Sequence, residues 1–193
     1  MACYIGTMAI DQDALVQDVL LLNASRAAIV DTSLLVFDET YRKACEQNRC
    51  GKYNTSWMGP PAVGPISELK ERVLRYKKGL LFQTVHTYQS SGLFDYKGMV
   101  EGGESHKQIF RRILEMIKTK YSFKAIFPLD AGCCTVCPKC AYLDNAPCRY
   151  PDQAVASLEA YGIDVMALEK AAGMPYYNGK GTYTFVGMFL FEE

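Results

Sequence analysis

The stretch from Ser105 to Leu129, SHKQIFRRILEMIKTKYSFKAIFPL, is the segment that most clearly predicts regular structure. Its apolar residues at 109, 110, 113, 116 and 117 recur at the spacing of an amphipathic helix. Ser105 and Gln108 fit the capping box that begins such a helix. Residues 124–129 then have the composition of a short strand. This stretch therefore predicts a helix followed by a strand that leads into a cysteine-rich loop at 132–151.

The rest of the chain alternates between segments of the same two kinds. Apolar spacing and capping residues predict the other helices, and β-branched or aromatic runs predict the strands. In chain order we expect a helix after Asp11 and Asp13, a strand or hairpin at 28–37, a helix from about Ser67, a strand at 80–86, a helix at about 164–172 and a buried strand at 183–191. Gly98, Gly102 and Gly103 predict a plain loop ahead of the helix at Ser105.

This alternation predicts an α/β or α+β fold in which helices and a mixed sheet form a sandwich. The chain has 193 residues, of which 49% are hydrophobic, and this size and composition are typical of one globular domain. We therefore expect a single domain over residues 1–193. Residues 41–65 are rich in Cys, Pro, Gly and Asn and predict a second cysteine-bearing loop, beside the one at 132–151.

Charge and hydropathy exclude two classes of partner. Lys and Arg total 21, as do Asp and Glu, so no net charge draws the chain toward nucleic acid. The longest apolar stretch, residues 181–191, is too short for a membrane-spanning helix, which needs about 20 residues. The first basic residue is Arg26, so the basic region of a secretory signal is missing. We expect a cytoplasmic protein that binds neither nucleic acid nor membrane.

The cysteines carry the strongest chemical signal. The chain has eight, a number that in a reducing compartment indicates metal ligation or redox chemistry. Cys134, Cys137 and Cys140 form a C-x2-C-x2-C run, and seven residues separate Cys140 from Cys148. A loop with such short steps can present each sulfur to a different iron of a cubane, while the fourth thiolate comes from outside the run. These four cysteines predict a [4Fe–4S] cluster.

Two other chemistries remain open for the same cysteines. A zinc site is the main alternative, although structural zinc more often takes two separated Cys pairs, or Cys with His. Thiol–disulfide exchange at Cys134 and Cys137 is the other, because C-x2-C alone is ambiguous.

Side chains other than cysteine have weaker patterns. His86 and His106 share no metal-binding spacing, so we expect them to be structural or exposed to solvent. Tyr53, Trp57 and Tyr150 flank the cysteine motifs, where aromatic side chains would either shield a cluster from water or belong to the core.

Several motifs together resemble a known family. They are Cys45-Glu-Gln-Asn-Arg-Cys50, Trp57-Met-Gly-Pro-Pro61, the cysteine run above with Cys148-Arg-Tyr-Pro151, and the segment 157–165. In these motifs the chain, from Cys45 onward, resembles the predicted metal-binding proteins of domain-of-unknown-function family 2284. The resemblance implies a small cysteine-rich protein of anaerobes that holds an iron–sulfur centre, with Cys134, Cys137, Cys140 and Cys148 as ligands. It implies no particular activity.

The first motif departs from the family pattern. Gly59 stands where family members have a cysteine before two prolines, so one thiolate of that motif is missing. Cys3, Cys45, Cys50 and Cys133 remain outside the main run. We expect one cluster, with Cys45, Cys50 and Cys133 as members of a possible second or auxiliary site, or with Cys45 and Cys50 as structural residues.

The predicted function is that of an iron–sulfur protein that transfers one electron at a time to a redox partner protein in anaerobic metabolism. One alternative is an enzyme whose cluster has an open iron coordination site. The other is a zinc-stapled interaction module with no redox role.

Overall fold

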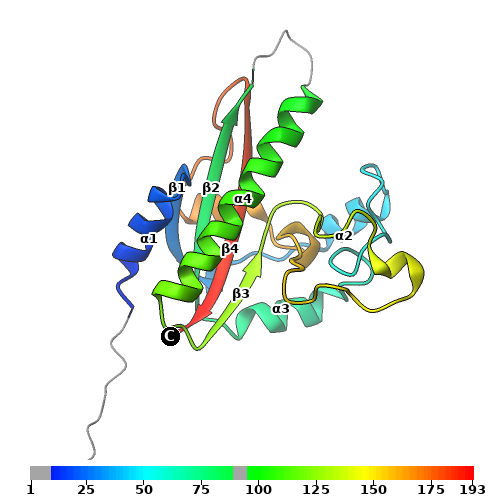
Figure 1. The fold of residues 1–193 in the computed structure, drawn as a ribbon, viewed down its shortest axis with the longest axis horizontal. Coiled ribbons are helices and arrows are strands. Elements are labelled where there is room, and N and C mark those ends of the chain that lie inside the picture. Colours follow the sequence, from blue (N-terminus) through cyan, green and yellow to red (C-terminus); the bar gives the residue numbers. More distant parts are fainter. Residues whose placement is uncertain (1–9, 89–94) are drawn as a thin grey trace, which may run out of the picture.

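The computed structural model describes residues 10–88 and 95–193, which form a four-stranded sheet with helices on both faces (Figure 1). The strands are β1 (Arg26–Asp31), β2 (Lys78–Thr87), β3 (Ala125–Leu129) and β4 (Thr182–Glu192), in the spatial order β1-β2-β4-β3. No helix within the described ranges is long and apolar enough to cross a membrane.

The predicted combination of helices and strands is confirmed, with one correction to the sheet. Every strand pair in it is antiparallel, whereas a mixed sheet was expected. Both β2 and β3 pair with β4, so they run parallel to each other and are joined by the long helix α4 (Tyr96–Lys120). The alternation of strand and helix thus reflects a split β-α-β unit, in which the last strand fills the gap between the two parallel strands.

One face of the sheet is covered by α4 and by α1 (Gln12–Leu21). Leu80 and Phe82 of β2 and Phe189 of β4 point to this face, where they meet Phe110 of α4. The ring centroids of Phe110 and Phe189 are 4.6 Å apart. Because each fully buried side chain of this size contributes about 1.5–3 kcal/mol, this cluster is one of the two sources of the fold's stability.

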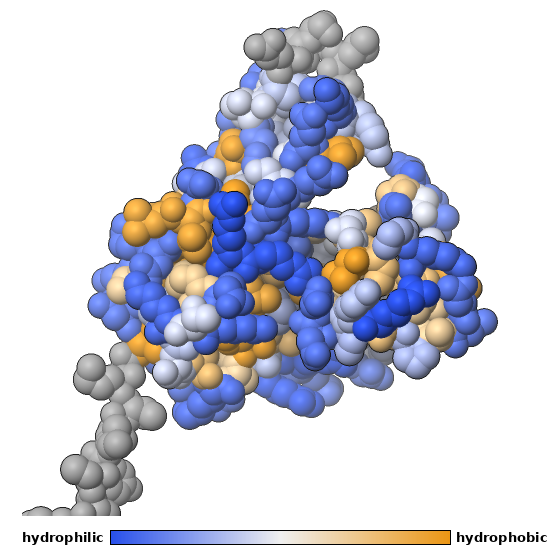
Figure 2. Space-filling model, viewed as in Figure 1, coloured by the Kyte–Doolittle hydropathy of each residue, from blue (hydrophilic) through white to orange (hydrophobic). Residues whose placement is uncertain are grey.

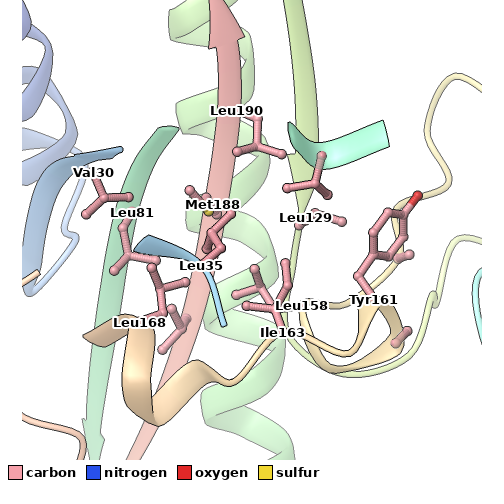
Figure 3. Close-up of a cluster of buried hydrophobic side chains, with 14 of the residues drawn as sticks. Val30, Leu35, Leu81, Leu129, Leu158, Tyr161, Ile163, Leu168, Met188 and Leu190 are labelled. Atoms are coloured by element: carbon pink, nitrogen blue, oxygen red, sulfur yellow. The ribbon is translucent and has the colours of Figure 1, made fainter. Parts of the chain in front are cut away.

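The opposite face is covered by α3 (Ile66–Leu74), α5 (Val165–Ala171) and the short turns η1 (Thr32–Leu34) and η3 (Glu159–Tyr161). Figure 3 shows Leu81, Met188 and Leu190 of the sheet pointing toward side chains of these segments. Since both faces are buried, β2 and β4 have nearly continuous apolar runs where a half-exposed strand would alternate.

The beginning of α4 differs from the prediction. The helix begins at Tyr96, and the side chain of its N-cap Asp95 accepts a hydrogen bond from the backbone N–H of Gly98. Ser105 therefore lies inside the helix, and the predicted capping box and glycine loop are both wrong. A Cβ added to Gly102 would lie only 3.1 Å from the ring of Phe185, so this glycine serves close packing of the helix on the sheet.

The other element boundaries agree with the prediction in most places. Asp11 caps α1, and α3, β2, α5 and β4 lie where the sequence predicted them. The run at 28–37 is not one strand, because β1 ends at Asp31 and η1 follows. The predicted loop at 41–65 begins only after α2 (Glu39–Glu46), whose first turn is capped by the side chain of Asp38.

Candidate metal centre

The cysteine-rich loop leaves the sheet at the end of β3 and returns to the same point. The backbone N–H of Asp130 donates to the carbonyl of Ala156 (2.9 Å), and the N–H of Leu158 donates to the carbonyl of Asp130 (3.1 Å). These two bonds close the base of the loop. In Figure 1 the loop lies at one side of the molecule, next to the segment that contains α2.

The loop brings four of the predicted ligands together. Cys134, Cys137, Cys140 and Cys148 line one small cavity, and all four are half-buried. Among the described residues that line this cavity, cysteine is the only type that commonly binds metals; the others are Ser56, Trp57, Met58, Val136, Tyr150 and Ala154. The donor set is therefore made of soft sulfur atoms, which suit zinc or iron–sulfur centres.

The four thiols surround the cavity without converging on one point. Within residues 10–88 and 95–193, no three His, Cys, Asp or Glu side chains are placed to hold a single metal ion. The seven cysteines in these ranges are all free thiols, and Cys3 lies outside the described residues.

Cys140 has the most distinctive environment of the four. Burial alone would raise the pKa of its thiol, but hydrogen bonds from the backbone N–H groups of Tyr142 and Trp57 and from the hydroxyl of Ser56 lower it overall. The positive charge of Arg149 acts in the same direction. These contacts stabilise the thiolate form of Cys140, which is the form of cysteine that binds metals.

A segment distant in sequence forms one wall of the cavity. The indole Nε1 of Trp57 donates to the carbonyl of Ala146 (3.0 Å), and its ring meets that of Tyr142 edge-on, with centroids 5.0 Å apart. The hydroxyl of Tyr142 in turn donates to the side-chain oxygen of Asn54. Trp57 and Tyr150 line the cavity, as the shielding hypothesis required, whereas Tyr53 does not.

The possible auxiliary cysteines lie elsewhere. Cys45 is on α2, where burial raises the pKa of its thiol, and Cys50 is exposed. Cys133 is also exposed, although it immediately precedes Cys134. None of the three lines the cavity of the other four cysteines, and Cys133 instead lines a small neighbouring cavity together with Cys134.

Helix α4 holds both ends of the cysteine-rich loop, which the sequence analysis missed. Lys107 Nζ donates to the carbonyl of Cys133 (2.7 Å) and to Thr135 Oγ1 (2.9 Å). One helical turn further, Arg111 Nη2 donates to the carbonyl of Gln153 (2.8 Å). The i, i+4 spacing of two basic residues on α4 was the available signal, but nothing local indicated their partners.

A buried chain of hydrogen bonds links the base of the loop to the far end of β2. His106 is fully buried; its Nε2 lies 3.0 Å from Asp130 Oδ1, and its Nδ1 lies 2.8 Å from Thr84 Oγ1. The Nε2 of His86 lies 3.0 Å from the same hydroxyl. A carboxylate only accepts, so Nε2 of His106 is the donor to Asp130.

Arg149 links two other residues of the cysteine-rich loop. Its Nη1 donates to the carbonyl of Lys139 (2.8 Å), and its Nη2 lies 3.5 Å from Asp144 Oδ2. Lys139 also pairs with this carboxylate, and the hydrogen bond and charge of Lys139, followed by the charge of Arg149, lower the pKa of Asp144. Two cations thus lie beside the predicted ligands Cys140 and Cys148.

Comparison with protein families agrees with this donor set. Residues 28–191 match the family model described as predicted metal-binding protein (DUF2284). The chain belongs to this family. The match begins at β1, well before Cys45, so the DUF2284 family shares the sheet as well as the cysteine motifs.

No curated protein sequence matches the chain. Among solved structures, epoxyqueuosine reductase from Bacillus subtilis is similar over 92% of this chain and 44% of that one, with 10% identity and a TM-score of 0.46. The chain thus spans less than half the length of that enzyme.

Proposed function

We propose that this DUF2284 protein binds a [4Fe–4S] cluster through Cys134, Cys137, Cys140 and Cys148 and passes single electrons to a partner protein. The observation that carries the proposal is the shared cavity, which these four thiols line with no other common metal ligand among its described lining residues. Four cysteines are the usual ligand set of a [4Fe–4S] cluster.

Zinc can also take four thiolates, and the sequence spacing favours iron and sulfur over it. A structural zinc site generally uses two separated pairs. Here Cys134, Cys137 and Cys140 follow each other with two residues between them, and only Cys148 is set apart. Such a run suits a group with several metal atoms, each of which takes one thiolate.

The chain contributes ligands, shielding and charge to this site. When bound, the cluster would supply reversible one-electron chemistry. Trp57 and Tyr150 line the cavity and would limit the access of water to it. Lys139 and Arg149 place positive charge beside the ligands, which favours the more negative, reduced state. Shielding and charge are both means by which a protein sets a reduction potential.

The surface near the ligands suits a protein partner. Leu143 and Tyr150 are about half exposed, at 50% and 47%, and lie in or next to the cysteine-rich loop. Exposed apolar side chains close to the cavity would let a redox partner approach the site directly. The thiolate ligands also require reducing conditions, so we place the protein in the cytoplasm of an anaerobic cell.

Elemental analysis after anaerobic purification tests the proposal. We expect about four irons and four acid-labile sulfides per chain, and a brown colour that bleaches with dithionite. Cys137→Ser should remove most of the iron and sulfide, while Cys133→Ser, one step outside the cavity, should retain them. Zinc without sulfide would overturn the proposal in favour of a zinc-stapled module, and a Cys137→Ser variant with full iron and sulfide would overturn the ligand assignment.

A further inference from the structure

A second and larger cavity lies between β4, α5 and the start of the cysteine-rich loop. Its volume is about 440 Å³, within the usual range for pockets that bind small molecules. Glu159 and Glu169 line it, as do residues 182–186 of β4 and Gly132, which immediately precedes Cys133. This cavity is distinct from the one lined by the four cysteines. The opposite face of the sheet carries α4, and Figure 2 shows that the surface over this helix is largely hydrophilic.

Glu169 is the unusual residue of this pocket. It is fully buried, and its Oε1 accepts a hydrogen bond from Gln83 Nε2. Its other carboxylate oxygen, Oε2, is also buried and has no hydrogen-bond partner among the described residues. Burial raises the pKa of Glu169 above its usual value. A buried oxygen of this kind is costly to leave without a donor, so its presence in a pocket wall indicates a ligand that supplies one.

The described side chains around Glu169 form their hydrogen bonds with other atoms and leave Oε2 without a donor. Gln83 is held in place, because its Nε2 also donates to the carbonyl of Pro175 (2.9 Å) and its Oε1 accepts from Arg26 Nη1 (3.0 Å). Arg26 is in turn engaged with Asn178 Oδ1, at 2.7 Å. Both of these hydrogen bonds of Arg26 go from Nη1 to neutral side chains, and neither reaches Glu169 Oε2.

The remaining lining defines the charge and shape of the ligand. Two carboxyl groups, those of Glu159 and Glu169, line the pocket, and its described lining includes no Lys, Arg or His. Tyr41, Tyr176 and Tyr177 also line it, and Tyr176 and Tyr177 are 55% and 71% exposed, at its rim. Aromatic faces attract cations and stack on planar groups. Carboxyl groups with aromatic walls together favour a planar, positively charged ligand that donates hydrogen bonds.

We propose that this pocket binds a small planar organic cation, such as an amidinium or guanidinium compound, one N–H of which donates to Glu169 Oε2. Glu159 adds a second negative charge, and Tyr177 closes over the ligand from the rim. The site is defined without reference to the cysteines, so it stands whether or not the neighbouring loop holds a cluster.

Titration calorimetry with benzamidine and two neutral or anionic analogues tests this. Benzamidine is a planar cation, benzamide has nearly the same shape without charge, and benzoate is an anion. We expect benzamidine to bind at least tenfold more tightly than either analogue. Glu169→Gln should weaken benzamidine binding at least tenfold, and Glu159→Gln should weaken it less. Glu115→Gln, an exposed position on α4, should leave it unchanged.

The outcomes separate the proposal from its rivals. If benzamidine fails to bind the wild-type protein, or if benzamide binds equally well, the cation site is wrong. Tyr177→Ala provides a second variant that removes only an exposed ring, and it should weaken benzamidine several-fold without changing the melting temperature. Unchanged binding in both Tyr177→Ala and Glu169→Gln would place benzamidine elsewhere and overturn the proposal. Iron and sulfide counted in the same samples report on the cluster separately.

Discussion

The two cysteine-bearing regions differ in how firmly the fold holds them. The loop at 132–151 is closed at its base by Asp130, bound at both ends by α4, and places four thiols around one cavity. In the region at 41–65, Cys45 lies on α2, which has no buried residue, and Cys50 is exposed. A cysteine motif becomes a candidate site where buried contacts fix the chain around it. Spacing alone does not achieve this.

The largest expected difference between the regions is in metal content. Cys148→Ser should lose most of the bound iron and sulfide, because it removes the one thiolate that comes from outside the tight run. Cys50→Ser should keep both at the wild-type level, since Cys50 does not line the cavity. Iron and sulfide assays on anaerobically purified variants measure this. Equal losses in the two variants would show that the first region also contributes ligands.

The second prediction concerns the anchoring of the two regions. His106→Ala removes a buried ring with hydrogen bonds to Asp130 and Thr84, so each partner loses one hydrogen bond and a cavity forms between α4 and the sheet. Thr84 keeps its contact with His86, so Asp130 and the cavity account for most of the effect, and we expect the free energy of unfolding to fall by about 2–4 kcal/mol. Urea denaturation of the protein without metal measures it directly.

A matched variant in the first region provides the control. Arg42 is half-buried and donates to the carbonyls of Gly64 and Ala160, at 3.0 and 3.1 Å. Arg42→Ala should cost only about 0.5–1.5 kcal/mol, because the freed carbonyls lie nearer to water. If Arg42→Ala and His106→Ala lower the free energy of unfolding equally, the two cysteine-bearing regions do not differ in how firmly they are held.

These contacts also show what could be predicted from the sequence and what could not. The strands β2 and β4 and the helix α5 were predicted because their signals, apolar runs and helix-compatible sequence, are local. The grouping of the four cysteines was predicted because they fall within one short segment. In contrast, His106 was expected to be structural or exposed, with no partner named, since Thr84 and Asp130 are 22 and 24 positions away.

The start of α4 was predicted wrongly because of its glycines, and the second cavity was not predicted because its residues are far apart in the sequence. Gly102 breaks a helix by propensity alone, yet here tertiary packing against Phe185 requires it inside one. Glu169 of α5 and Gln83 of β2 are 86 residues apart and meet on one face of the sheet, and no local pattern marks either as functional. Contacts of this kind depend on the order of the strands in the sheet, where β4, the last strand of the chain, lies between β2 and β3.

The third prediction tests the contact between the two regions. Trp57→Phe keeps an aromatic ring in the cavity wall but removes the indole N–H that donates to the carbonyl of Ala146. One hydrogen bond of this kind contributes about 1 kcal/mol to stability. We expect the free energy of unfolding, measured by urea denaturation, to fall by about this amount. We also expect the bound cluster to bleach faster in air. An unchanged bleaching rate would mean that the first region does not protect the second.

A smaller effect is expected from pH, through the chain of hydrogen bonds that ends at His86. Burial, and then the nearby His106, lower the pKa of His86 below its usual value of about 6.5. The unfolded chain therefore binds a proton at His86 at a higher pH than the folded protein does. Stability from this residue is fully present above about pH 6.5 and is lost as the pH falls through the folded pKa. His86→Gln should flatten that part of the stability profile, and a profile identical to wild type would assign the slope to other groups.

The smallest expected effect comes from Gly59→Cys, which restores the cysteine that the first motif lacks. Gly59 does not have a positive φ, and the nearest heavy atom to an added Cβ is 4.0 Å away, so a Cβ fits there without displacing its neighbours. The free energy of unfolding should change by no more than about 0.5 kcal/mol. Iron should stay at about four per chain, because a third thiolate does not supply the buried contacts that hold the second region in place. An increase toward eight irons would instead mean that the first region is already shaped as a site and lacks only this ligand, which would erase the difference between the two regions.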